Sequence, residues 1–120
     1  MRLSTITVWV EDPRALRDWY MSHLDFVLLQ ETPRFVLLAE DASATCIGFH
    51  IGDPLATPER LQFHLEVDDV DATYERLVAE GLEFEGPPQD RPWGVRSTAT
   101  TDPAGHSVEI TTPFRATPGS

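Results

Sequence analysis

His64 and Glu109 are the side chains of this sequence best suited to acid–base chemistry. His64 lies in the segment LQFHLEV and Glu109 in HSVEIT, two segments in which apolar and polar residues alternate. An imidazole exchanges a proton near neutral pH, and burial in an apolar cleft can raise the pKa of a carboxyl group toward the same range. The two residues are therefore the candidate catalytic residues, and the sequence leaves open whether a reaction takes place.

The other reactive groups form no recognisable catalytic pattern. Cys46 is the only cysteine, so no internal disulfide is predicted. It lies in the apolar run ATCIGFHI, which predicts a buried and unreactive thiol. The sequence contains neither a nucleophile elbow nor a glycine-rich phosphate loop, so it predicts neither a catalytic triad nor a phosphate site of that kind.

The elements that must position these residues occur twice along the chain. VWVEDPRALRDWYMSHLDF (residues 8–26) aligns with LEVDDVDATYERLVAEGLEF (residues 65–84) after a shift of 57 positions, with one extra residue late in the second copy. Each copy contains the end of an alternating strand and a helical pattern. Three β-rich segments then follow in each half: FVLLQE, RFVLLAE and TCIGFHI in the first, and LEFEG, VRSTATT and HSVEIT in the second.

Local residues mark the ends of the two predicted helices. Asp12 is placed as an N-cap with Pro13 at the first helical position, where its missing N–H costs nothing. Asp68 or Asp69 caps the second helix, and Gly81 ends it.

The predicted fold class is therefore α+β, with two tandem βαβββ modules that form a curved mixed sheet around a cleft. The predicted boundaries are a single domain at residues 1–115, modules at about 3–52 and 60–113, and a loose C-terminal tail at 116–120.

Each module has one helix, which leaves the opposite face of its sheet open toward the cleft. Alternation along the strands decides which side chains lie on that open face. Those predicted to do so are Thr5, Thr7, Trp9, Gly48, His50, Gln62, His64, Glu66, Ser107, Glu109 and Thr111.

Composition restricts the partners. Acidic residues outnumber basic residues 20 to 9, and the formal net charge of −11 argues against binding to nucleic acid or to an anionic membrane surface. The same charge keeps the protein soluble or attracts a cationic ligand. No signal peptide and no apolar run of about 18 residues is present, so the predicted location is cytoplasmic.

The segment RPWGVRSTATTDPAGHSVEI (residues 91–110), together with the V-x-D junctions at Val10 and Val67, resembles the vicinal oxygen chelate superfamily. That superfamily includes glyoxalase I, extradiol dioxygenases, fosfomycin-resistance enzymes and the bleomycin-resistance proteins. The ending is typical of the bleomycin-resistance-like branch, and the resemblance extends from about residue 3 to 113. It implies the paired βαβββ fold, a homodimer and a small-molecule ligand, with Trp93 either lining the cleft or packing in its loop.

The resemblance also implies where a divalent metal would bind. In metal-dependent members four side chains hold the ion, and they correspond here to Thr5, Gly48, Gln62 and Glu109. Only the glutamate is a strong ligand, and the glycine has no side chain. A different set, His50 and His64 with Glu109, lies two residues along the strands from the expected positions, which is about 6–7 Å. We therefore predict no metal and no cofactor; if there is a cofactor, it is a divalent metal ion.

Two functions follow from the resemblance. The first is metal-free binding of a small molecule that is planar or cationic, as in antibiotic sequestration. The alternative is a lyase, isomerase or dioxygenase of the superfamily that uses a divalent metal or the acid–base chemistry of Glu109 and His64. The predicted ligand-binding residues are Thr5, Thr7, Trp9, His50, Gln62, His64, Trp93 and Glu109.

Overall fold

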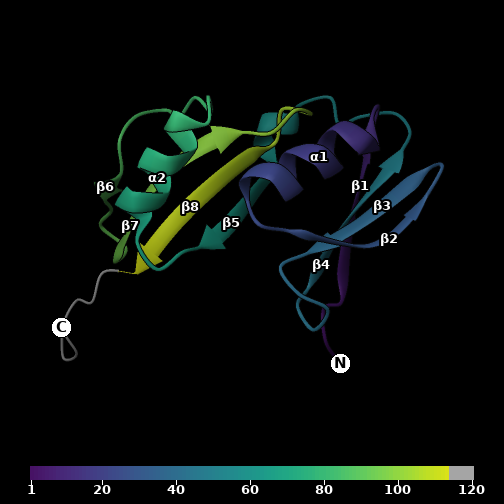
Figure 1. Cartoon of the computed structure of the whole chain (residues 1–120), viewed down its shortest axis with the longest axis horizontal. Coiled ribbons are helices and arrows are strands. Elements are labelled where there is room, and N and C mark those ends of the chain that lie inside the picture. The colour runs from purple at the N-terminus through teal and green to yellow at the C-terminus, as the bar shows by residue number, and fades with distance from the viewer. Residues whose placement is uncertain (114–120) are drawn as a thin grey trace. The chain divides into compact units, whose positions relative to one another are not determined.

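The computed structural model describes residues 1–113, which form two compact units. The first unit contains residues 1–58 and 102–104, and the second contains residues 59–101 and the described residues from 105 onward. Each unit has a four-stranded mixed sheet and one α-helix (Figure 1). The two predicted βαβββ modules are thus confirmed, whereas the predicted tail at 116–120 lies outside the described residues.

The first unit follows the predicted order of elements. These are β1 (Thr5–Val10), α1 (Pro13–His23), β2 (Val27–Thr32), β3 (Phe35–Ala39) and β4 (Cys46–Ile51). The strands lie in the order β1-β4-β3-β2, in which β1 is parallel to β4 and the other pairs are antiparallel. Residues 5–10 alternate because one side of β1 contacts the core, where Val8 and Val10 are buried.

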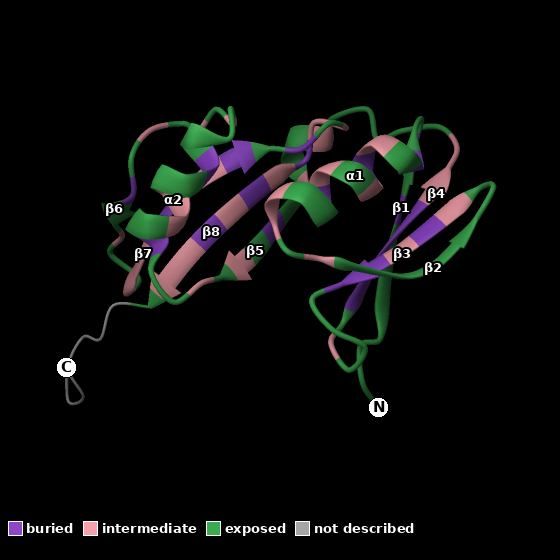
Figure 2. Cartoon of the chain, viewed as in Figure 1, coloured by how far each residue is buried: buried purple, intermediate pink, exposed green. Residues whose placement is uncertain are grey.

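The second unit repeats this arrangement after a short 3₁₀ helix, η1 (Pro58–Arg60). Its elements are β5 (Gln62–Glu66), α2 (Val70–Ala79), β6 (Gln89–Asp90), β7 (Val95–Thr101) and β8 (Ser107–Pro113). The strand order is β5-β8-β7-β6, with β5 parallel to β8. The central strands carry buried residues, whereas β2 of the first unit is exposed along its whole length (Figure 2).

One predicted strand was wrong. The segment LEFEG (residues 82–86) forms only an isolated bridge between Phe84 and Thr100, and the edge strand of this sheet is the two-residue β6. Threonine hydroxyls of β7 take part in holding the segment: Thr100 donates to the carbonyl of Glu83 and Thr98 to that of Gly86, each at 2.6 Å. These bonds use backbone carbonyls that would otherwise be available to a strand ladder.

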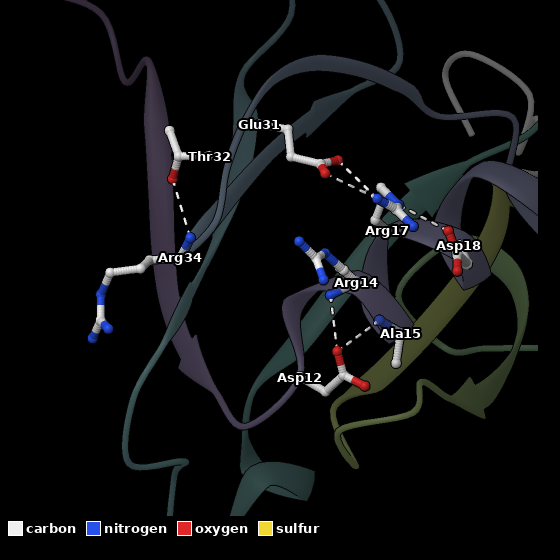
Figure 3. A network of polar contacts seen from close by, with 8 residues as sticks. All are labelled: Asp12, Arg14, Ala15, Arg17, Asp18, Glu31, Thr32 and Arg34. Atoms are coloured by element: carbon white, nitrogen blue, oxygen red, sulfur yellow. Dashed lines mark hydrogen bonds and ion pairs between the residues drawn. The ribbon is translucent and has the colours of Figure 1, made fainter.

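Side-chain carboxylates cap both helices as predicted. Oδ1 of Asp12 accepts hydrogen bonds from the amides of Arg14 at 3.1 Å and Ala15 at 3.3 Å (Figure 3). Asp69, rather than Asp68, caps α2 by accepting from the amide of Ala72 at 3.1 Å. Gly81 has a φ of +99°, the left-handed conformation that ends the helix.

An ion-pair network joins α1 to the exposed edge strand. Arg17 contacts Oε1 of Glu31 on β2 at 2.9 Å and Oδ1 of Asp18 at 2.8 Å (Figure 3). The two carboxylates raise the pKa of the Arg17 guanidinium, with Asp18 the larger cause. The Arg17–Glu31 ion pair therefore links α1 to β2 on the face of the sheet opposite the open face.

No helix among residues 1–113 has the length and hydropathy needed to cross a membrane.

Candidate functional site

The open face of the first unit carries a row of rings. Trp9 on β1 is the register partner of His50 on β4, and the centroids of their rings are 5.9 Å apart. Phe35 on β3 pairs with His50 from the other side, with ring centroids 6.1 Å apart. We call Trp9, His50 and Phe35 the aromatic row.

Two glycines of the β4 segment allow the outer rings to lie close to the backbone. A Cβ atom at Gly48 would be only 2.7 Å from Cε1 of Phe35, and a Cβ atom at Gly52 would overlap Cδ1 of Trp9. Real Cβ atoms do not approach other atoms so closely, so side chains at these two positions would displace the rings. Trp9 as a residue is nevertheless 50% exposed, so its side chain remains accessible to a ligand.

The sequence predictions named two members of this row but missed the third. Trp9 and His50 follow from alternation along β1 and β4, and the structure places them side by side as predicted. Phe35 was missed because alternation was applied only to the first and last strands of each module. The register of β3 against β4, in which Phe35 pairs with His50 and Leu37 with Gly48, is the signal that identifies it.

The open face of the second unit carries hydrogen-bonding groups in place of rings. His64 on β5 is the register partner of Glu109 on β8, and Nδ1 of the imidazole lies 3.0 Å from Oε1 of the carboxylate. In the neighbouring pair, Nε2 of Gln62 donates to Oγ of Ser107 at 2.9 Å. Three predicted ligand-binding residues, Gln62, His64 and Glu109, and the open-face residue Ser107 thus form two pairs on one face.

The His64–Glu109 pair has an uneven exposure that matters for its chemistry. The side chain of His64 is 57% exposed, whereas that of Glu109 is 14% exposed. Because a carboxylate accepts hydrogen bonds, Nδ1 of the imidazole carries the hydrogen in this contact. The pair can therefore hold a ligand cation near Glu109 or exchange a proton through the exposed imidazole.

Most of the remaining predicted residues are exposed. Thr5 and Thr7 are exposed on β1. Glu66 is exposed beside Thr111, whose Oγ1 atom is buried and has no partner within residues 1–113. Trp93 precedes Gly94, which has a φ of +92°, and it is 69% exposed.

A family model described as the glyoxalase/bleomycin resistance protein/dioxygenase superfamily matches residues 2–110. This chain belongs to that superfamily. The match covers both units and agrees with the family predicted from the RPWG and DPAGH segments.

Individual relatives support the family and the fold. An uncharacterised protein of Mycobacterium tuberculosis is 26% identical to this chain. The alignment covers 88% of this chain and 71% of the length of that protein. Among solved structures, a superfamily member from Nocardioides superposes with a TM-score of 0.82 at 21% identity, over 100% of this chain and 88% of that one. TnmS3, an antibiotic binding protein from Streptomyces sp. CB03234, is 29% identical with a TM-score of 0.75, over 94% of this chain and 96% of that one.

A lactoylglutathione lyase from Agrobacterium tumefaciens also superposes, with a TM-score of 0.74 at 19% identity, over 92% of each chain. At this identity the likeness shows a common fold alone.

The superfamily's metal ligands do not fit the residues present in this chain. The corresponding position at Gly48 has no side chain, and the Phe35 ring lies where one would begin. In the other candidate set, Nδ1 of His64 contacts Glu109 and Nδ1 of His50 lies 2.7 Å from the carbonyl oxygen of Ile51, which leaves only Nε2 of each imidazole for an ion. Within residues 1–113, no three His, Cys, Asp or Glu side chains are grouped so that they could hold an ion.

Proposed function

We propose that this protein binds a flat small molecule, without a metal, on the aromatic row of its first unit. The observation that carries the proposal is the placement of Phe35 and Trp9 over Gly48 and Gly52, with Trp9 still 50% exposed. Flat rings that lie on a sheet face provide a surface on which a planar ligand stacks, and each aromatic contact of this kind contributes about 0.5–1.5 kcal/mol. TnmS3 is an antibiotic binding protein, and this supports a ligand of the antibiotic class.

Charge favours a cationic or neutral ligand over an anionic one. The chain has a formal net charge of −11, and Glu109 and Glu66 add carboxylates to the open face of the second unit. Such a field draws a cation in and weakens as salt is added. We propose sequestration, in which the ligand leaves chemically unchanged.

We propose that the protein acts as a homodimer. Several large apolar side chains are exposed in the single chain, among them Val27, Leu28 and Leu29 on β2. An exposed edge strand with apolar side chains favours pairing or packing with another chain, and a second copy provides the same chemistry. Sedimentation velocity at micromolar concentration should give a dimer; a monomer would contradict this part of the proposal and leave the binding face intact.

The binding proposal is tested by a fluorescence and thermal-shift screen of cationic glycopeptide and planar antibiotics, with small α-keto acids and diols as a second set. A planar ligand should quench tryptophan emission and raise Tm by mass action. Product analysis of each hit should return the compound unchanged. Trp9→Ala should abolish most of the quenching, whereas loss of quenching with Trp93→Phe alone would place the ligand elsewhere.

A second candidate function rests on the 3.0 Å contact between His64 and Glu109. A carboxylate that orients an imidazole is a common arrangement for general acid–base catalysis. On this proposal a ligand that approaches the second unit exchanges a proton with His64, and Glu109→Gln lowers the rate of conversion. Appearance of a product in the same screen, and its loss in Glu109→Gln, would favour this enzyme over the binding protein.

A further inference from the structure

We infer that His50 makes the aromatic row selective for planar ligands that carry a hydrogen-bond donor, such as a phenolic hydroxyl or a ring N–H. The inference rests on the proposed function, because it concerns a ligand stacked on that row. It names the chemical group that the ligand must present and the atom that recognises it.

A backbone carbonyl determines which tautomer the neutral imidazole of His50 adopts. Nδ1 of His50 lies 2.7 Å from the carbonyl oxygen of Ile51. A carbonyl oxygen only accepts hydrogen bonds, so this contact requires the hydrogen to be on Nδ1. In the neutral ring Nε2 then carries a lone pair and acts as an acceptor.

That acceptor has no partner of its own. Among residues 1–113, no hydrogen bond or ion pair reaches Nε2 of His50, although the imidazole is half-buried. The ring lies between Trp9 and Phe35, at centroid distances of 5.9 and 6.1 Å. A planar ligand on the row therefore covers an acceptor that water would otherwise satisfy.

The aromatic row is selective because a bound ligand covers this acceptor. A ligand that carries a donor replaces the lost water hydrogen bond, whereas a ligand without one leaves a buried acceptor unsatisfied. The neighbouring groups do not compensate, because Thr7 and Gly48 lie two residues further along their strands on the same face, about 6–7 Å away. We expect the donor-bearing ligand to bind about tenfold more tightly, the ratio that one hydrogen bond of ordinary strength provides.

Two matched probes test the inference: 2-naphthol, which has a donor, and 2-methoxynaphthalene, which has the same ring but no donor. Dissociation constants are measured by NMR titration against wild type, His50→Phe, His50→Gln and the control His23→Phe, which changes a histidine of α1. Wild type and His23→Phe should prefer the naphthol about tenfold. His50→Phe keeps a ring and should bind both probes equally, and His50→Gln, which restores an acceptor, should recover part of the preference.

The outcomes separate the inference from the proposed function. If wild type binds both probes equally, His50 does not select donors and the inference is wrong, although the aromatic row still binds rings. If wild type binds neither probe while its fold is intact, the ring-binding function and the inference both fail. Long-range ¹⁵N–¹H NMR correlations of the wild-type imidazole give a check that needs no variant: a hydrogen on Nε2 instead of Nδ1 overturns the inference.

Discussion

The hydroxyl of Tyr20 donates a hydrogen bond of 2.8 Å to Oδ2 of Asp102, and both side chains are buried although they are 82 positions apart in the chain. Asp102 lies in the DPAG turn between β7 and β8, but residues 102–104 belong to the first unit. Oδ1 of the same carboxylate accepts from the amide of Ala104 at 2.9 Å, which shapes the turn. The DPAG segment therefore forms a turn and also contributes a buried polar contact to the first unit.

Tyr20→Phe should lower the free energy of unfolding by about 1.5–3 kcal/mol, because it removes a hydrogen bond to a buried charged group. Chemical denaturation monitored by circular dichroism measures the change. Tyr74→Phe is the matched control, since that half-buried tyrosine contacts Phe84 edge-to-face and its hydroxyl has no hydrogen bond within residues 1–113. Equal losses in the two variants would mean that the Asp102 contact contributes nothing.

Stability should decrease in strong alkali for the same structural reason. Burial, and secondarily the negative charge of Asp102, raises the pKa of Tyr20 above its ordinary value. The folded state thus retains the tyrosine proton more tightly than the unfolded state, so this contribution is complete below about pH 10 and is lost as the pH rises above it. Between pH 8 and 11, the free energy of unfolding should decrease more steeply for wild type than for Tyr20→Phe, by up to about 1.4 kcal/mol per pH unit. Equal slopes for the two proteins would contradict this prediction.

Gly52→Ala should weaken binding of a planar ligand about tenfold, because the added methyl group displaces the Trp9 indole from the sheet. Folding should be retained, since the half-exposed indole can move into solvent. Gly86→Ala is the control: a Cβ atom there meets nothing within 4 Å. Tryptophan emission reports the displacement of the indole, and ligand titration reports the change in affinity. Unchanged affinity in Gly52→Ala would show that the position of the indole is irrelevant to binding.

Titration of the purified protein with nickel, zinc, manganese and ferrous iron should reveal no tightly bound ion at one per chain. Gly48 supplies no ligand and Phe35 occupies its surroundings, so Glu109 would lack the partners that a divalent ion needs. Isothermal calorimetry and elemental analysis check this. A stoichiometric ion that is lost in Glu109→Gln would support the metal-dependent enzyme in place of the binding protein.

Much of the fold was predictable because its determinants are local. The two-residue period of β1 and β5 and the Asp-Pro junction at Asp12 depend on neighbouring residues, and the repeat shows that the pattern occurs twice. Alternation also predicted that Trp9 would share a face with His50, and His64 with Glu109. A strand has only two faces, so residue parity within each strand determines that face before any packing is known.

Tertiary structure decided the features that depend on distant partners. LEFEG has the composition of a strand, but threonine hydroxyls of β7 bond to its carbonyls and leave the two-residue β6 at the sheet edge. Phe35 lies in the aromatic row because of the register of β3 against β4. Asp102 accepts a hydrogen bond from Tyr20, which is 82 positions away in the chain. Periodicity constrains only the direction in which a side chain points. The partner of that side chain depends on packing among segments that lie far apart in the chain, and steric fit and hydrogen-bond satisfaction determine that packing.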